Sequence, residues 1–237
     1  MCGRYATYGP VSVSRQAREV LDELDLDLVS EINQRDDAFN IAPTHRALVV
    51  THGEQGYEAG LLRWGLIPSW AKDAKLGAKT INARAETVAT KPAFRNAFKK
   101  RRCLIPASGF FEWRVESAGK QPYFIHDPAG HLLMFAGVWE AWRPSENDDW
   151  LKTFTIITGA PGKVSGDIHD RQPVILPPDV WQAWMTDTVD EAAALLAAVP
   201  EAELVSYPVP KAVGSPRNNR PELVQPITVD AEPDDLL

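Results

Sequence analysis

The hydrophobic pattern divides the chain into a helical start and a long β-rich part. From Val13 to Leu28, apolar residues recur at three- and four-residue spacing behind the N-cap residue Ser14, which predicts a helix. Short apolar runs and turns with Gly or Pro predict strands at 103–106, 110–115, 123–126, 132–138 and 154–158. We therefore expect an α+β fold, with mostly antiparallel β-sheets that form a barrel-like core and with peripheral helices.

The remaining elements are expected to join these strands in one domain. The pattern predicts further strands at 47–51, 61–66, 174–176 and 206–209, with a hairpin over 53–56. It predicts helices at 90–98, 178–185 and 190–198, the first with Pro92 in its first turn, and a long loop over 68–80. We expect a single domain over residues 1–229 and a disordered acidic tail over residues 230–237.

Composition places the chain among ordinary globular proteins. Its 237 residues include 44% hydrophobic and 24% charged residues, and no apolar run approaches the eighteen or so residues of a membrane span. The start lacks the apolar segment of a signal peptide. Two cysteines are too few for a disulfide framework. These features predict a protein of the reducing cytoplasm.

Charge is unevenly distributed along the chain. The net charge of −7 argues against a nucleic-acid partner, but residues 63–102 hold eleven basic and two acidic residues, a net +9. A basic run such as Lys99 to Arg102 is by itself typical of a solvated helix end. The same segment also contains Trp64 and Trp70, and cationic side chains beside exposed aromatic rings are typical of a platform for single-stranded nucleic acid.

Cys2 becomes the N-terminal residue if Met1 is removed. It then carries a free amine and a thiol two carbons apart. An aldehyde condenses with such an amine to an imine, and the thiol closes a five-membered thiazolidine ring. The amine is partly unprotonated near neutral pH, because its ordinary pKa is about 7.7–8.0. The alternative is an ordinary residue at a frayed chain end.

DNA presents an aldehyde at an abasic site when its sugar ring opens, and ring opening needs an acid and a base. His169 titrates near neutral pH and suits proton transfer, although a loop histidine bonded to Asp170 or Asp167 is the alternative. Glu112 lies in an aromatic strand. Its alternative is an exposed ion pair with Arg114, whereas in a cleft its pKa would rise.

Two polar residues near position 80 could hold the reactants. Asn82 could anchor the terminal amine or the sugar, with a turn-forming amide as the alternative. Arg84, two residues later, shares its face of a strand and suits a phosphate.

Six motifs occur in an order that identifies a family. They are Cys2-Gly3-Arg4-Tyr5, Phe39-Asn40-Ile41-Ala42-Pro43, Arg63-Trp64-Gly65-Leu66-Ile67-Pro68-Ser69-Trp70, Ile81-Asn82-Ala83-Arg84-Ala85-Glu86, Gly109-Phe110-Phe111-Glu112-Trp113 and Ile168-His169-Asp170-Arg171-Gln172-Pro173. In these motifs the chain resembles the SRAP family (SOS response-associated peptidase domain), the abasic-site processing proteins, over about residues 2–228.

The resemblance implies a thiazolidine crosslink between processed Cys2 and abasic sites in single-stranded DNA. It implies that Asn82 orients Cys2 and that Glu112 and His169 are the acid/base pair. The residues that it implies for DNA binding are Arg4, Pro43, Trp70, Arg84 and Thr158. Some members place a second aromatic residue directly after the Trp70 position, where this chain has Ala71.

Two other functions are considered. A thiol peptidase is suggested by Cys2, His169 and Asn82, and self-cleavage could remove Met1, although an aminopeptidase could do the same. A non-catalytic single-strand binding module would explain the basic segment but neither Cys2 nor Glu112. We expect no metal, because the five histidines lack ligand spacing, and no cofactor. We also expect a monomer that has no obligate protein partner and does not bind a membrane. When it binds DNA, it is expected to associate with the nucleoid.

Overall fold

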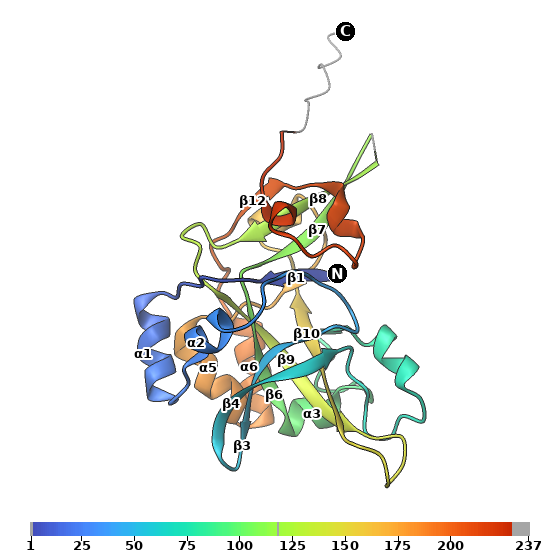
Figure 1. Cartoon of the computed structure of the whole chain (residues 1–237). Coiled ribbons are helices and arrows are strands. Elements are labelled where there is room, and N and C mark those ends of the chain that lie inside the picture. The colour runs from blue at the N-terminus through green and yellow to red at the C-terminus, as the bar shows by residue number, and fades with distance from the viewer. Residues whose placement is uncertain (1, 118, 229–237) are drawn as a thin grey trace.

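The computed structural model describes residues 2–117 and 119–228 (Figure 1). Five strands close into a barrel: β3 (Arg46–Gly53), β4 (Gly56–Trp64), β6 (Arg102–Ala107), β9 (Leu133–Trp142) and β10 (Leu151–Gly159). Neighbouring strands are antiparallel, except that β10 runs parallel to β4 where the ring closes. The expected hairpin is confirmed, because Gly53 pairs with Gly56.

Alternation along the barrel strands separates two packed layers. On β3, Val49 belongs to the cluster inside the barrel, whereas Val50 belongs to the cluster under the helices. Phe135 and Ala136 divide in the same way on β9. Phe154 is wholly buried in the inner cluster. The barrel is therefore a filled core and not a channel.

A second sheet covers one end of the barrel. Its order is β12 (Val205–Pro208), β8 (Gly119–His126), β7 (Gly109–Glu116), β1 (Arg4–Thr7) and β2 (Ala38–Ile41). In Figure 1 β1 lies between the barrel below and strands β7, β8 and β12 above.

Tyr5 of β1 joins the second sheet to the barrel. Its ring packs edge-on against Trp64 at 5.3 Å and against Phe135 at 6.0 Å between ring centroids. This contact holds the first residues of the chain at the mouth of the barrel.

Helices and short segments complete the α+β fold, whose class is confirmed. The helices are α1 (Arg15–Glu23), α2 (Leu28–Asn33), α3 (Arg95–Lys100), α4 (Lys163–Gly166), α5 (Trp181–Thr186) and α6 (Val189–Ala198). The other short elements are β5 (Asn82–Arg84), β11 (Gln172–Pro173), η1 (Ala74–Lys79), η2 (Pro178–Val180), η3 (Lys211–Gly214) and η4 (Pro221–Val224). The expected acidic tail over 230–237 lies outside the described residues.

Several expected elements differ from those observed. The helix expected over 13–28 is two helices, because the backbone turns at Asp25 (φ 51°) and Asp27 caps α2 by accepting a hydrogen bond from the Ser30 amide. The loop expected over 68–80 contains the 3-10 helix η1. The helix expected from residue 90 begins only at Arg95, since the preceding residues form turns.

The expected exposure of Trp64 is wrong. Its side chain is wholly buried in the barrel, and its indole Nε1 donates to the Ile81 carbonyl at 2.8 Å. The alternation of β4 places Trp64 on the inner face, where a large ring fills the barrel and cannot stack on a base.

Gly65, at the end of β4, can be tested as a required glycine. It has φ +112°, and a Cβ there would lie 2.5 Å from the Gly77 carbonyl oxygen, whereas Gly56 has φ +99° in open space. Gly56→Ala is expected to cost about 1 kcal/mol, from backbone strain alone. Gly65→Ala is expected to cost about 3 kcal/mol or more, because backbone atoms must also move apart. Denaturant unfolding measures both, and equal losses would contradict the close approach.

Candidate active site

Cys2 lies buried at the mouth of the barrel, directly before β1. Its side chain is wholly buried, so the alternative of a frayed chain end is wrong. Burial raises the pKa of the Cys2 thiol well above its ordinary value, and the negative charge of Glu112 raises it further. The thiol is therefore held protonated in this form of the chain, which still carries Met1.

Asn82 holds the backbone of Cys2 in place. β5 runs parallel to β10, with Asn82 paired to Ile156. This pairing places the Asn82 side-chain amide beside the N-terminal segment. The Asn82 Nδ2 group donates to the Cys2 carbonyl at 2.8 Å. The Asn82 Oδ1 atom is buried and has no hydrogen-bond partner among the described residues. Asn82 begins a strand, so its alternative as a turn-forming amide is wrong.

Glu112 is a buried carboxyl group beside Cys2. β7 pairs with β1, with Arg4 opposite Phe111, which brings the next residue of β7 toward the first residues of the chain. Only 2% of Glu112 is exposed. Burial raises its pKa to about 7, and the charge of Asp170 contributes to the rise. The alternative of an exposed Glu112–Arg114 pair is wrong, because Arg114 binds Glu116 at 2.6 Å.

His169 lies between α4 and β11 with about a third of its side chain exposed. Its Nδ1 atom accepts from the Arg171 backbone amide at 3.1 Å and lies 2.9 Å from the Asp170 carboxylate. The contact between His169 and Asp170, which the sequence offered as the alternative to a catalytic role, is thus present. Partial burial nevertheless lowers the pKa of His169, although the Asp170 charge acts to raise it. The imidazole is therefore mainly neutral at pH 7.

Arg171 fixes the loop that carries His169. Its guanidinium binds both Glu86 carboxylate oxygens, at 2.7 and 2.9 Å, and also donates to the Thr158 carbonyl. This fork joins the loop to β10 and to the turn after β5. The sequence reasoning did not select Arg171 or Glu86, although both lie inside the quoted motifs and a charged pair of this kind could have been sought there.

The residues expected to bind DNA occupy different surroundings. Arg84 is exposed at the end of β5 and pairs in register with Thr158. The Thr158 hydroxyl is buried and donates to the Ala83 carbonyl at 3.5 Å, so only its backbone meets the His169 loop, through Arg171. Arg4 donates to the carbonyls of Gly3 and Gly214 at 2.8 and 3.3 Å.

Pro43 and Trp70 lie on connecting segments. Pro43 follows β2 and is partly exposed. Trp70 is 56% exposed, and its Nε1 donates to the Pro92 carbonyl at 3.4 Å. Among the described residues, neither Pro43 nor Trp70 forms a hydrogen bond with Cys2. The structure thus brings Asn82 and Glu112 closer to Cys2 than the residues expected to contact bases.

The described residues form neither a metal-binding cluster nor a membrane-spanning helix. Within residues 2–117 and 119–228, no cluster of three or more His, Cys, Asp or Glu side chains has the arrangement of a metal site. None of the helices in that part of the chain has the length and apolar character needed to span a bilayer.

Comparison with known proteins places this chain in a family. Residues 1–216 match the family described as SOS response associated peptidase (SRAP). The chain is 39% identical to abasic site processing protein YoaM of Bacillus subtilis over 228 residues, which cover 94% of this chain and 97% of that protein. It is 32% identical to abasic site processing protein YedK of Escherichia coli, with 96% of this chain and 100% of that protein covered.

A solved structure shares the fold. A crystal structure of a protein from Bacteroides thetaiotaomicron superposes with a TM-score of 0.77 at 27% identity, covering 94% of this chain and all of that one. The overall fold is thus shared with a solved structure. The chain belongs to the SRAP family.

Proposed function

We propose that this protein processes abasic sites in single-stranded DNA by forming a covalent crosslink through Cys2 after Met1 is removed. Relatives that align along almost their whole length are named abasic site processing proteins. The observation that carries the proposal is the hydrogen bond from the Asn82 amide to buried Cys2, with the buried Glu112 carboxyl group near enough for its charge to raise the pKa of the Cys2 thiol. This arrangement supplies a nucleophile, an anchor and a proton-transfer group at one point.

The crosslink forms in three steps. The open sugar exposes its C1′ aldehyde, and the free Cys2 amine adds to it to give a carbinolamine. Loss of one water leaves an imine between the nitrogen and C1′. The thiol then adds across the imine, so that sulfur bonds to C1′ and its proton ends on nitrogen. The product is a thiazolidine ring, and the net loss is one water.

Glu112 and His169 carry the protons in this proposal. A carboxyl group with a pKa near 7 is half protonated at neutral pH and serves as the acid that protonates the ring oxygen. Neutral His169 serves as the base for the anomeric hydroxyl. The free Oδ1 of Asn82 accepts a hydrogen bond from the new amine, which orients its lone pair toward C1′. Reversal of the crosslink uses the same groups.

The other expected residues hold the DNA in this proposal. Arg4 and Arg84 contact phosphate or sugar, because guanidinium groups suit phosphate oxygens. Pro43 and Trp70 contact the bases beside the lesion. Thr158 supports the His169 loop through its backbone carbonyl.

A thiol peptidase acting on other proteins is less well supported. Such an enzyme needs a thiolate, and its cysteine pKa is lowered by a neighbouring cation. Burial and Glu112 instead raise the pKa of the Cys2 thiol. We therefore assign any peptidase activity to the single removal of Met1.

A denaturing gel after heating tests the proposal. The protein is mixed with single-stranded DNA that carries one natural abasic site, or with DNA that carries a tetrahydrofuran analogue lacking the aldehyde. We expect a heat-stable shifted band with the natural site only. Bands with both DNAs, or no band together with cleavage of an added peptide, would contradict it.

A further inference from the structure

The basic segment 63–102 presents most of its cations on the surface. Two of its arginines serve the fold: Arg101 binds Glu140 at 2.6 Å, and buried Arg102 donates to the Phe98 carbonyl at 2.9 Å. A third, Arg63, is partly buried. The exposed remainder consists of Lys72, Lys75, Lys79, Arg84, Lys91, Arg95, Lys99 and Lys100.

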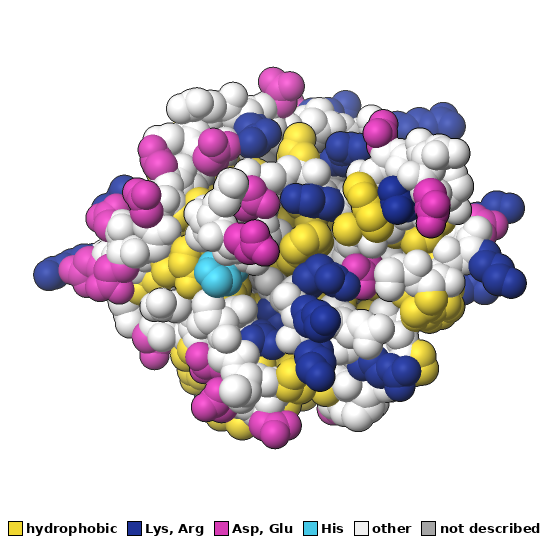
Figure 2. Space-filling model, turned by 90° about the horizontal axis from the view of Figure 1, so that it is seen from below, with side chains coloured by type: hydrophobic (Ala, Val, Ile, Leu, Met, Phe, Trp, Pro, Cys, Tyr) yellow, Lys and Arg dark blue, Asp and Glu magenta, His cyan; other side chains and the backbone are white. Residues whose placement is uncertain are grey.

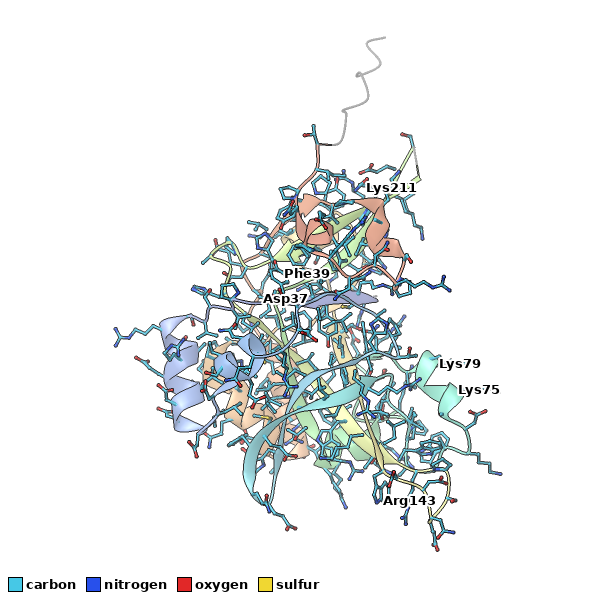
Figure 3. All side chains as sticks on the ribbon, in the orientation of Figure 1. Asp37, Phe39, Lys75, Lys79, Arg143 and Lys211 are labelled. Carbon is cyan, nitrogen blue, oxygen red and sulfur yellow. The ribbon has the colours of Figure 1, made fainter. Side chains whose placement is uncertain are left out.

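Trp70 lies between two groups of these cations. On one side, Lys72, Lys75 and Lys79 line a groove of about 430 Å³ together with Trp70 itself. Figure 3 shows Lys75 and Lys79 projecting outward from η1. On the other side, the indole Nε1 donates to the Pro92 carbonyl, in the segment that leads into α3. The exposed ring therefore connects the η1 lysines with α3.

The α3 cations are defined as Lys91, Arg95, Lys99 and Lys100. In the part of the chain that the structure describes, none of them forms an ion pair. Figure 2, which views the molecule from below, shows Lys and Arg side chains gathered in a band across that face. An unpaired row of cations beside an exposed ring is complementary to a phosphate backbone with bases.

A favourable interaction with the helix dipole accounts for the position of only two of the four α3 cations. Lys99 and Lys100 lie in the last turn of α3, where the partial negative charge of the helix end favours cations. Lys91 and Arg95 lie before and at the start of α3, where the partial positive charge disfavours them, and the first turn holds no acidic residue. Binding of an anionic partner would account for cations at both ends.

The other exposed tryptophan has a different setting. Trp150 is 58% exposed, but the guanidinium of Arg143 lies over its ring at 4.5 Å. The loop between Arg143 and Trp150 also carries Glu146, Asp148 and Asp149. This acidic loop would repel a phosphate backbone, so a strand that reaches Trp70 is directed toward α3.

We propose that the single strand flanking the lesion runs from Arg84 along η1, stacks a base on Trp70 and continues with its phosphates on the α3 cations. This path rests on the proposed function, because it begins at the crosslinking site. It assigns a DNA contact to the α3 cations, which lie outside the site described above. The partner is the phosphate backbone of single-stranded DNA, bound without regard to base sequence.

The test compares two fourfold variants that lower the net charge equally. One changes Lys91, Arg95, Lys99 and Lys100 to Gln. The control changes Arg15 and Arg18 on α1, Arg35 just after α2 and Lys163 on α4 to Gln. Binding is measured with lesion-free single strands of increasing length and at several salt concentrations. A second matched pair is Trp70→Ala and Trp150→Ala, since both rings are similarly exposed.

The α3 variant is expected to bind long strands about tenfold more weakly or worse at low salt, and short strands as wild type does. Its plot of log K against log salt should be shallower by about 3, since each lost phosphate contact contributes roughly 0.7 on single strands. Trp70→Ala should weaken binding and Trp150→Ala should not. Equal weakening of binding by the α3 and control variants would overturn the path.

The yield of heat-stable adduct distinguishes a failure of the DNA path from a failure of the proposed function. The α3 variant should still form the heat-stable adduct with a short abasic strand, because the four cations lie outside the reacting groups. If wild type forms no adduct but the length dependence holds, the proposed function fails and the binding surface stands.

Discussion

An N-terminal extension that cannot be removed is expected to abolish the heat-stable adduct with abasic DNA. The extension leaves the Cys2 thiol in place but keeps its nitrogen in a peptide bond, so no imine can form. Cys2→Ser after removal of Met1 keeps the amine but replaces the thiol. It should give only a labile imine adduct, which heat hydrolyses and borohydride reduction preserves. The yield of heat-stable adduct on a denaturing gel measures both changes.

Cys103 provides the matched thiol control. It is buried inside the barrel, and burial raises the pKa of its thiol, but it has no free amine. Cys103→Ala should retain the heat-stable adduct. Loss of adduct in the Cys103 variant with full yield from the extended protein would refute the amino-thiol chemistry.

Glu112→Gln is expected to slow adduct formation by a factor on the order of 10² to 10⁴, the range for loss of a general acid or base. The amide has nearly the same shape but carries no transferable proton. Wild type needs protonated Glu112 and neutral His169. Its rate should fall toward acidic pH, below the ordinary histidine pKa, as His169 gains a proton, and again above about pH 7 as Glu112 loses one.

The pH profile identifies Glu112 as the source of the upper limb. Single-turnover rates from pH 5 to 9 should show that limb in wild type and not in Glu112→Gln. Glu116→Gln is the control, because Glu116 lies on the same strand but binds Arg114. If the Glu112 variant keeps both its rate and the upper limb, Glu112 is not the acid.

Burial of Glu112 also makes the stability of the fold depend on pH. The pKa of Glu112 is raised on folding. Its contribution to the free energy of unfolding is therefore fully present below the ordinary pKa of 4.5 and is lost as pH rises through about 7. The protein thus keeps a buried carboxyl group that weakens the fold at high pH. This cost is typical of a group retained for proton transfer.

The fold class could be predicted because alternation is a local signal. Val49 and Val50 are adjacent in sequence and enter opposite layers, which the period of two requires. The closure of the ring could not be predicted, since it depends on parallel pairing of Thr153 with Arg63, which lie ninety positions apart in the sequence. The helix break at Asp25 was also missed, because apolar spacing continues through it.

The site was predicted less completely than the fold. Motif order selected Cys2, Asn82 and Glu112, and the structure places these residues together. The exposure of Trp64 was misjudged, because a positive local charge does not show which face of a strand is buried. Arg171 was missed because its role arises from a contact with Glu86, eighty-five residues earlier.

Tandem mass spectrometry of the adduct with abasic single-stranded DNA tests the central claim most directly. The account predicts a protein that lacks Met1, with the DNA fragment attached at Cys2 and one water lost. Fragment ions should assign both the nitrogen and the sulfur of that residue to the new ring. An adduct located on a lysine, or on a chain that still carries Met1, would contradict it.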